Sequence, residues 1–289
     1  MDKLLTVVIP SYNVEKFLNQ TLDSFVCDEV AMKKFEVIVV DDGSKDNTAK
    51  IGKEYADKYP DTFRVISKEN GGHGSTINCG IRNAVGKYFK VVDGDDWVNT
   101  ADFVKLVEDL EKTESEYVFT NYYEYYDDVN RQKAVDFPQF KDGTEYDFAD
   151  VANKVCIPMH ALVIKTSVLK DNNIVIDEKC FYVDVEYVMF PVPFVNKVTF
   201  FDLHVYMYRL ALSTQSVSIL GFQKHINDHL RVTFHMFDFY RDYISSDKAD
   251  SAKADYMRTC IADLIITQSA IYSSYPDSDM ENRRRFMEF

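Results

Sequence analysis

The chain has 289 residues, and its 47 Asp and Glu residues outnumber its 33 Lys and Arg residues, which gives a formal net charge of −14. This length suits one large α/β domain with a small appendage. The acidic balance argues against a nucleic-acid-binding surface and against a patch for anionic membranes. The five cysteines contain no CxxC pair, and we expect them to be buried free thiols in a reducing compartment.

The first 122 residues alternate between apolar runs and segments with helical spacing. We expect strands at residues 4–9, 35–40, 63–67, 87–92 and 116–122, with a helix after each of the first four. Pro10 is expected to end the first strand, Asn13 to cap the next helix, and Asn99 or Thr100 to cap the helix after the fourth strand. The alternation predicts a mostly parallel sheet, wound right-handedly.

The rest of the chain has a more mixed pattern. We expect a polar loop at 127–147, strands at 161–165 and 198–202, and helices at 183–195, from 221 onward and at 251–272. One apolar stripe at helical spacing, which we expect to be a packed face, consists of Phe222, Ile226, Leu230, Phe234 and Phe237. No apolar stretch is long enough to span a bilayer, and no signal-peptide pattern is visible at the start.

Two acidic clusters each follow a short apolar run. Asp41 and Asp42 come after the second expected strand, and residues 93–96 (DGDD) come after the fourth. Buried parallel strands deliver their carboxyl ends to the edge where open α/β sheets bind ligands, so both clusters can share one crevice. The first cluster also fits an ordinary turn between a strand and a helix, because Asp, Gly and Ser are favoured there.

The second cluster carries the sharper signal. Three carboxylates at a buried strand end repel one another, and a divalent cation with oxygen ligands relieves that repulsion. An EF-hand is excluded, because Trp97 and Val104 stand where calcium ligands belong. An open site with few protein ligands suits Mg²⁺ or Mn²⁺ on a diphosphate. The plainer alternative is an acidic lead-in to the helix that begins near Thr100.

The other polar features are weaker. The glycine loop at 71–74 matches neither a dinucleotide fingerprint nor a P-loop, and it could be a simple connector or a close approach of backbone to a ligand. His73 and His160 are single histidines, which are packed or hydrogen-bonded by default. Asp184 and Glu186 fit an acidic helix start. Taken alone, none of these residues identifies a site.

In order along the chain, residues 7–13, 39–48, 70–74 and 92–97 together resemble the family-two glycosyltransferases of bacterial surface-polysaccharide synthesis. The resemblance is strong over residues 1–122 and looser to about 217. It implies an α/β, Rossmann-like GT-A fold with a mostly parallel central sheet. Residues 1–217 would be the GT-A domain, with a nucleotide-binding half (1–122) and an acceptor half (123–217), and residues 218–289 would be a helical C-terminal extension.

The resemblance implies a nucleotide-sugar site built from these motifs. Pro10 and Tyr12 would line the nucleotide pocket, with Tyr12 against the base, and Asp42 would accept a hydrogen bond from the base N–H. Gly72 and His73 of the glycine loop would also contact the nucleotide sugar. By analogy with the family, a UDP-sugar is the favoured donor.

The resemblance further implies a DxD element that binds a divalent metal, Mn²⁺ or Mg²⁺. Asp95 would hold the metal, with Asp96 as an alternative ligand. Asp93 would help to bind the metal or the ribose, and Gly94 between them would lie against the nucleotide sugar. This element would neutralise the diphosphate leaving group.

Asp184 stands where the family commonly places its general base, although Val183 replaces the glutamate that usually precedes it. Arg209, with Tyr208 and residues 215–216, resembles the segment that closes over the diphosphate. Ile77 stands where many members carry an arginine, so that arginine has no equivalent here.

The resemblance therefore predicts a metal-dependent, inverting transfer of a sugar from a nucleotide-diphosphate sugar to a hydroxyl of a glycan or a lipid-linked acceptor. Two alternatives stay open. A nucleotidyltransferase would carry a basic, glycine-rich triphosphate loop near the N-terminus, and residues 10–13 are not one. A non-catalytic sugar-nucleotide-binding protein is the other. We expect the protein to be cytoplasmic, either free or peripheral at the inner membrane face.

Overall fold

The structure is a computed structural model, and it describes residues 3–210, 216–276 and 278–289. The strands within these ranges are β1 (Leu5–Ser11), β2 (Phe35–Asp41), β3 (Phe63–Ser67), β4 (Tyr88–Val91), β5 (Trp97–Val98), β6 (Tyr117–Tyr126), β7 (Arg131–Val135), β8 (Thr144–Asp147), β9 (Leu162–Lys165) and β10 (Lys197–Leu210). The helices are α1 (Leu18–Asp23), α2 (Glu29–Met32), α3 (Thr48–Lys58), α4 (His73–Asn83), α5 (Thr100–Asp109), α6 (Phe148–Ala152), α7 (Thr166–Asp171), α8 (Asp184–Met189), α9 (Ile219–Lys224), α10 (Ile226–Ile244), α11 (Ser251–Ser273) and α12 (Met280–Glu288).

The described strands form one sheet in the order β3-β2-β1-β4-β9-β6-β10-β5, with β7 beside β6 and β8 beside β10. The pairs among β1, β2, β3 and β4 are parallel, and β6 pairs with β10 in parallel as well. β9 runs antiparallel between β4 and β6. The sheet is therefore mostly parallel at its centre, as predicted.

Side chains that alternate along the strands build two cores on opposite faces of the sheet. On one face, Val7 and Val39 pack with α1 and α5. On the other face, Val8 and Val40 pack with α4 and α8, and the same core continues into α10 and α11. Because helices cover both faces, the central strands read as continuous apolar runs in the sequence.

The first strand is longer than predicted, because Pro10 lies inside β1 and pairs with Val40. The β4 register ends at Val91, opposite Val8, so no ladder bond at this point needs the N–H that proline lacks. Asn13 is not a helix cap either. It has a φ of 55°, and its side chain accepts a hydrogen bond from the Lys45 N–H at 2.9 Å.

Two predictions for the second half were wrong. Residues 127–147 contain β7 and β8, which were expected to be loop. Both strands lie outside the central run of the sheet, and they are largely exposed, so they need no apolar run. The helix expected at 183–195 ends at Met189, because Pro191 and Pro193 permit only a short 3₁₀ turn over Val192–Phe194.

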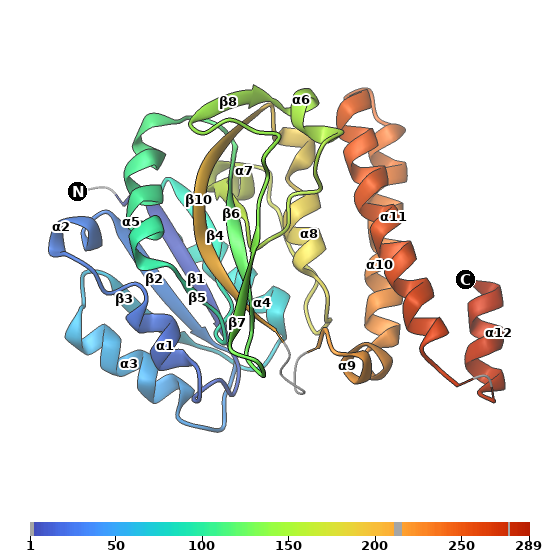
Figure 1. Cartoon of the computed structure of the whole chain (residues 1–289), viewed down its shortest axis with the longest axis horizontal. Helices are drawn as coiled ribbons and strands as arrows, with labels where there is room; N and C mark the ends of the chain where they lie inside the picture. The colour runs from blue at the N-terminus through green and yellow to red at the C-terminus, as the bar shows by residue number, and fades with distance from the viewer. Residues whose placement is uncertain (1–2, 211–215, 277) are drawn as a thin grey trace.

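The C-terminal helices lie on one flank of the molecule, with α10 and α11 side by side (Figure 1). The apolar stripe predicted on α10 is only partly packed, since Phe234 is 55% exposed and Phe237 is 49% exposed. The packed face of α10 instead carries His229, Val232 and Met236. None of the described helices is long and apolar enough to cross a membrane.

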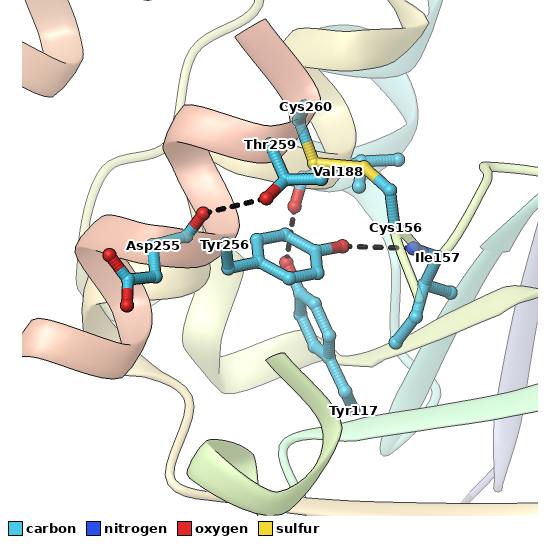
Figure 2. Close-up of a disulfide and its surroundings, with 8 residues drawn as sticks. All are labelled: Tyr117, Cys156, Ile157, Val188, Asp255, Tyr256, Thr259 and Cys260. Atoms are coloured by element: carbon cyan, nitrogen blue, oxygen red, sulfur yellow. Dashed lines mark hydrogen bonds between the residues drawn. A yellow bond between two sulfur atoms is a disulfide. The ribbon is translucent and has the colours of Figure 1, made fainter. Parts of the chain in front are cut away.

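The prediction of free thiols throughout was also wrong. Cys156, in the segment before β9, forms a disulfide with Cys260 of α11. Figure 2 shows this disulfide beside Tyr256, whose hydroxyl accepts a hydrogen bond from the Ile157 N–H at 3.0 Å. The disulfide therefore ties the C-terminal helices to the sheet domain. Cys27, Cys79 and Cys180 are free.

Candidate active site

Two adjoining cavities lie at the carboxyl ends of β1, β2 and β4. One, of about 430 Å³, contains Asp42 and Gly72, and the other, of about 340 Å³, contains the DxD residues and Asp184. They share the lining residues Pro10, Tyr12, His73 and Phe181. We call the two together the donor crevice. Of the residues that the resemblance assigned to the nucleotide sugar, the metal and the base, all but Arg209 line it.

Asp42 is buried and holds the glycine loop in place. Its Oδ1 accepts a hydrogen bond from the Gly71 N–H at 2.9 Å and its Oδ2 accepts one from the Gly72 N–H at 2.8 Å. Lys68 Nζ lies 2.6 Å from Oδ1 and neutralises the carboxylate. Gly72 has a φ of +82°, and a Cβ there would approach the backbone of Lys179 to 3.2 Å. The loop is thus fixed against the crevice wall.

His73 begins α4 and pairs with Asp93, with 2.8 Å between Nε2 and Oδ1. Burial alone would raise the pKa of Asp93, but the adjacent His73 outweighs burial and lowers it. Burial likewise opposes the charged form of His73, but Asp93, Asp184 and Asp95 together raise the pKa of this histidine. The sequence pattern alone predicted a packed or hydrogen-bonded histidine, and the family resemblance predicted a contact with the nucleotide sugar. The structure places His73 against Asp93 in the lining of the donor crevice.

Burial and neighbouring carboxylates disfavour the charged forms of Asp95 and Asp96. Burial, followed by the charge of Asp93, raises the pKa of Asp95 to about 6. Burial and the charges of Asp95 and Asp93 raise the pKa of Asp96 well above its ordinary value, although the Tyr206 hydroxyl donates to it at 2.6 Å. Gly94 between the two aspartates of the DxD element has no room for a side chain, since a Cβ would lie 2.9 Å from the Pro10 carbonyl oxygen.

Arg209 lies behind the acidic loop and does not line the donor crevice. Its Nε donates to the Asp95 carbonyl oxygen at 2.8 Å, and its backbone N–H donates to Asp96 Oδ1 at 2.7 Å. Its guanidinium also pairs with Asp127 and lies 4.6 Å from the centre of the Trp97 ring. These contacts fix the shape of the DxD loop. Residues 211–215, which include Gln215, lie outside the described residues.

Asp184 is the first residue of α8, and it reaches the donor crevice from the far half of the sheet. Lys179 and Tyr182, in the segment before α8, both have positive φ, and both line the donor crevice. Burial and the charge of Asp93 raise the pKa of Asp184, against the opposing effect of His73. A carboxylate with a raised pKa is a stronger proton acceptor. Ile77, at the position of the missing arginine, is buried in the core.

His160 is the residue that sequence reasoning missed. Its ring lies 3.9 Å from the ring of Tyr208 and 5.0 Å from that of Tyr206, and it lines the donor crevice. Burial lowers its pKa to about 4, so the ring is neutral at pH 7. The sequence carries no signal that points to His160. In the structure its backbone is held by Lys90, whose Nζ donates to the His160 carbonyl oxygen at 2.8 Å.

The possible ligand atoms at this end of the crevice fit a divalent metal. Oxygen atoms of Asp93 and Asp96 and a ring nitrogen of His160 all lie within 4.8 Å of one another. Carboxylates suit both Mg²⁺ and Mn²⁺, and a neutral imidazole is a better ligand for transition metals. Asp95 is not part of this group among the described residues, so its role as metal ligand stays a prediction.

Comparison with known proteins gives consistent matches. The sequence profile of the family described as "Glycosyl transferase family 2" matches residues 6–171. The chain is 37% identical over 123 residues to an uncharacterized glycosyltransferase, EpsJ, of Bacillus subtilis, which is 43% of this chain and 35% of that protein. It is 33% identical over 111 residues to the minor teichoic acid biosynthesis protein GgaB of the same organism, or 38% of this chain and 12% of GgaB. These matches span only a minor part of either relative.

Solved structures match over nearly the whole chain. S. aureus TarS 1–349, in complex with UDP-GlcNAc, has a TM-score of 0.69 at 19% identity, over 99% of this chain and 79% of that one. The mannosyltransferase PcManGT from Pyrobaculum calidifontis, in complex with GDP-Man and Mn²⁺, has a TM-score of 0.59 at 16% identity, over 100% and 79%. At these identities the likeness is one of fold, and it confirms the predicted GT-A architecture with C-terminal helices.

Proposed function

The chain belongs to glycosyl transferase family 2, and from this premise we propose that it transfers a sugar from a nucleotide-diphosphate sugar to an acceptor hydroxyl, with inversion and with help from a divalent metal. The observation that carries the proposal is the donor crevice itself. Carboxylates from the DxD loop and from α8 line one cavity that also contains Pro10, Tyr12 and His73. Residues proposed to bind the nucleotide and the proposed general base, Asp184, therefore line the same cavity.

Each group has a definite part in this reaction. Tyr12 is 47% exposed at the rim, where its ring can stack on a base. The ion pair of His73 and Asp93 lies in the donor crevice, and a protonated His73 would supply a positive charge to a diphosphate bound there. A metal held by the acidic cluster would act as a Lewis acid on the leaving diphosphate. Asp184 would take the proton from the acceptor hydroxyl as it attacks.

The donor is proposed to be a UDP-sugar. TarS, whose fold this chain shares, is described in complexes with UDP-GlcNAc and with UDP. The metal is proposed to be Mn²⁺ or Mg²⁺, and a neutral His160 near the carboxylates favours Mn²⁺. The proposed acceptor is a glycan or a lipid-linked glycan, and the proposed location is the cytoplasm, including the inner membrane face.

Release of nucleoside diphosphate tests this proposal. The purified chain is incubated with a panel of UDP-, GDP- and dTDP-sugars, with Mn²⁺, Mg²⁺ or a chelator, and the free nucleoside diphosphate is measured. We expect release from at least one UDP-sugar, dependent on metal. Release of pyrophosphate from a nucleoside triphosphate would instead identify a nucleotidyltransferase. Metal-dependent binding of a nucleotide sugar without any turnover would identify a non-catalytic binding protein.

A further inference from the structure

A third cavity, of about 300 Å³, lies between α8, the segment 156–159 and α11. We call it the rear pocket. Asp184 and Met159 line both this cavity and the donor crevice. The proposed base is thus the carboxylate that the two spaces have in common. A base that takes a proton from an attacking hydroxyl has to stand between the acceptor and the donor sugar.

The lining of the rear pocket is mostly apolar. Ile157, Val188 and Leu264 contribute aliphatic side chains, and the disulfide of Cys156 and Cys260 forms part of the wall. Of the residues that line it, Asp184, Asp263 and Thr267 carry oxygen atoms in their side chains, and none is Lys, Arg or His. Two carboxylates without a cation disfavour a phosphate or a carboxylate in this space.

The walls of the rear pocket are fixed from several sides. The disulfide joins the segment 156–159 to α11. The Tyr256 hydroxyl accepts the Ile157 N–H at 3.0 Å, and the Tyr117 hydroxyl donates to the Val188 carbonyl oxygen at 2.7 Å, as Figure 2 shows. The disulfide and the Tyr256 hydrogen bond join the segment 156–159 to α11, and the Tyr117 hydrogen bond joins β6 to α8, so the walls of the cavity are fixed on both sides. A preformed cavity with few polar groups is typical of a small-molecule site.

We propose that the rear pocket is the acceptor subsite, and that it takes an uncharged glycoside whose apolar ring face or aglycone packs against Leu264 and Val188. The assignment rests on the proposed transferase function. The reacting hydroxyl lies at Asp184, which accepts its proton as the new glycosidic bond forms and the bond to the diphosphate breaks. Asp263 and Thr267 lie on one face of α11. The Asp263 carboxylate accepts a hydrogen bond from another hydroxyl of the acceptor, and the Thr267 hydroxyl donates one.

The test measures UDP release from the accepted UDP-sugar, first with water as the only acceptor and then with added glycosides. The probes are n-octyl glycosides of glucose, galactose and N-acetylglucosamine, the matching methyl glycosides, and the 6-phosphates of the methyl glycosides. We expect at least one octyl glycoside to stimulate release, with a KM at least tenfold below that of its methyl counterpart. We expect no stimulation by the phosphorylated compounds.

Two variants locate the effect. Leu264→Trp and Thr267→Trp fill the rear pocket from α11, so each is expected to abolish the stimulation by octyl glycosides and to leave UDP binding and release into water unchanged. Thr267 is only partly buried, so Thr267→Trp still tests the pocket if Leu264→Trp fails to fold. Ile266→Trp is the matched control, because Ile266 lies on the same helix but is 66% exposed.

The outcomes separate the two proposals. If the chain neither binds UDP nor releases it from any nucleotide sugar, the transferase function fails, and the acceptor subsite fails with it. If UDP is released but both pocket-filling variants respond to octyl glycosides as the natural chain does, the subsite assignment alone is overturned. Stimulation by the phosphorylated glycosides equal to that by the octyl glycosides would overturn the assignment to an uncharged acceptor.

Discussion

The described residues up to 122 and those beyond 122 line different parts of the donor crevice, which we call the donor wall and the acceptor wall, and they do so by different means. The first part contributes β1, β2 and β4, parallel strands buried on both faces, and its polar residues follow directly after the strand ends. The second part contributes Asp184 and His160 from short segments that long-range contacts hold in place. Local sequence therefore specifies the donor wall, whereas the acceptor wall depends on packing between distant segments.

This contrast assigns separate tasks to the two halves. The donor wall carries His73, the DxD element and the exposed Tyr12, which are the groups proposed to bind a nucleotide diphosphate. The far wall carries the candidate base and, through α11, the rear pocket. Changes in the second half should therefore affect transfer with little effect on donor binding, and changes in the DxD element should affect both.

The largest expected effect is at Asp184. Asp184→Asn removes the proposed base and keeps its size, so transfer is expected to fall by about 10²- to 10⁴-fold, the range for loss of acid–base help. UDP affinity in the presence of Mn²⁺ is expected to stay the same within about twofold. Steady-state transfer and UDP titration measure the two quantities. Asp171→Asn, at the exposed end of α7, is the control. Full turnover by the Asp184 variant would move the base to another residue.

Asp95→Ala tests the donor wall. The carboxylate of partly buried Asp95 has a pKa raised to about 6 and lacks a positive partner as strong as His73 is for Asp93; a bound cation would provide one. We expect Mn²⁺ to raise the UDP affinity of the natural chain at least tenfold and to leave the UDP affinity of this variant unchanged. Titration of UDP with and without Mn²⁺ measures this gain. An unchanged metal dependence would contradict the role of Asp95 and leave the metal to Asp93, Asp96 and His160.

Cys156→Ser tests how the second half is attached. The disulfide closes a loop with a sequence separation of 104 residues, and loss of such a bond typically costs about 2 to 4 kcal/mol of stability. We expect a lower melting temperature under oxidising conditions, weaker stimulation by glycosides and unchanged UDP affinity. Cys27→Ser, which removes a free cysteine, is the control. If UDP affinity fell together with the melting temperature, the two walls would not be independent.

Lys90 tests the junction between the halves, because its Nζ on β4 donates to the carbonyl oxygens of His160 and Leu162. Burial lowers the pKa of Lys90 from 10.5 to about 7, so above pH 7 the unfolded chain binds a proton here that the folded chain does not. Stability therefore rises with pH through this window. Relative to Lys90→Met, we expect the natural chain to gain about 2 kcal/mol between pH 7 and 9. Urea unfolding at both pH values measures the gain, and parallel pH curves for the two proteins would contradict it.

The sequence alone predicted most of the first half. The strand β3 was predicted to the residue, and Asn99 caps α5 as expected. A strand buried on both faces has to be apolar throughout, so β1 and β2 are visible in the sequence, although β1 runs on to Ser11 beyond its predicted end at residue 9. The polar residues that follow such ends were expected to meet in one crevice, and Asp42 and Asp95 do line its adjoining cavities.

What only the tertiary structure decided lies in the second half. The edge strands β7 and β8, the disulfide of Cys156 and Cys260, the place of His160 and the cavity behind Asp184 have no local signature. Each depends on contacts between residues far apart in the chain. A strand on a sheet edge can be polar, so no apolar run marks it. The sequence around a cysteine or a histidine does not show which distant residue will contact it in the fold. Only the packing of α11 and the segment before β9 against the sheet brings these groups together.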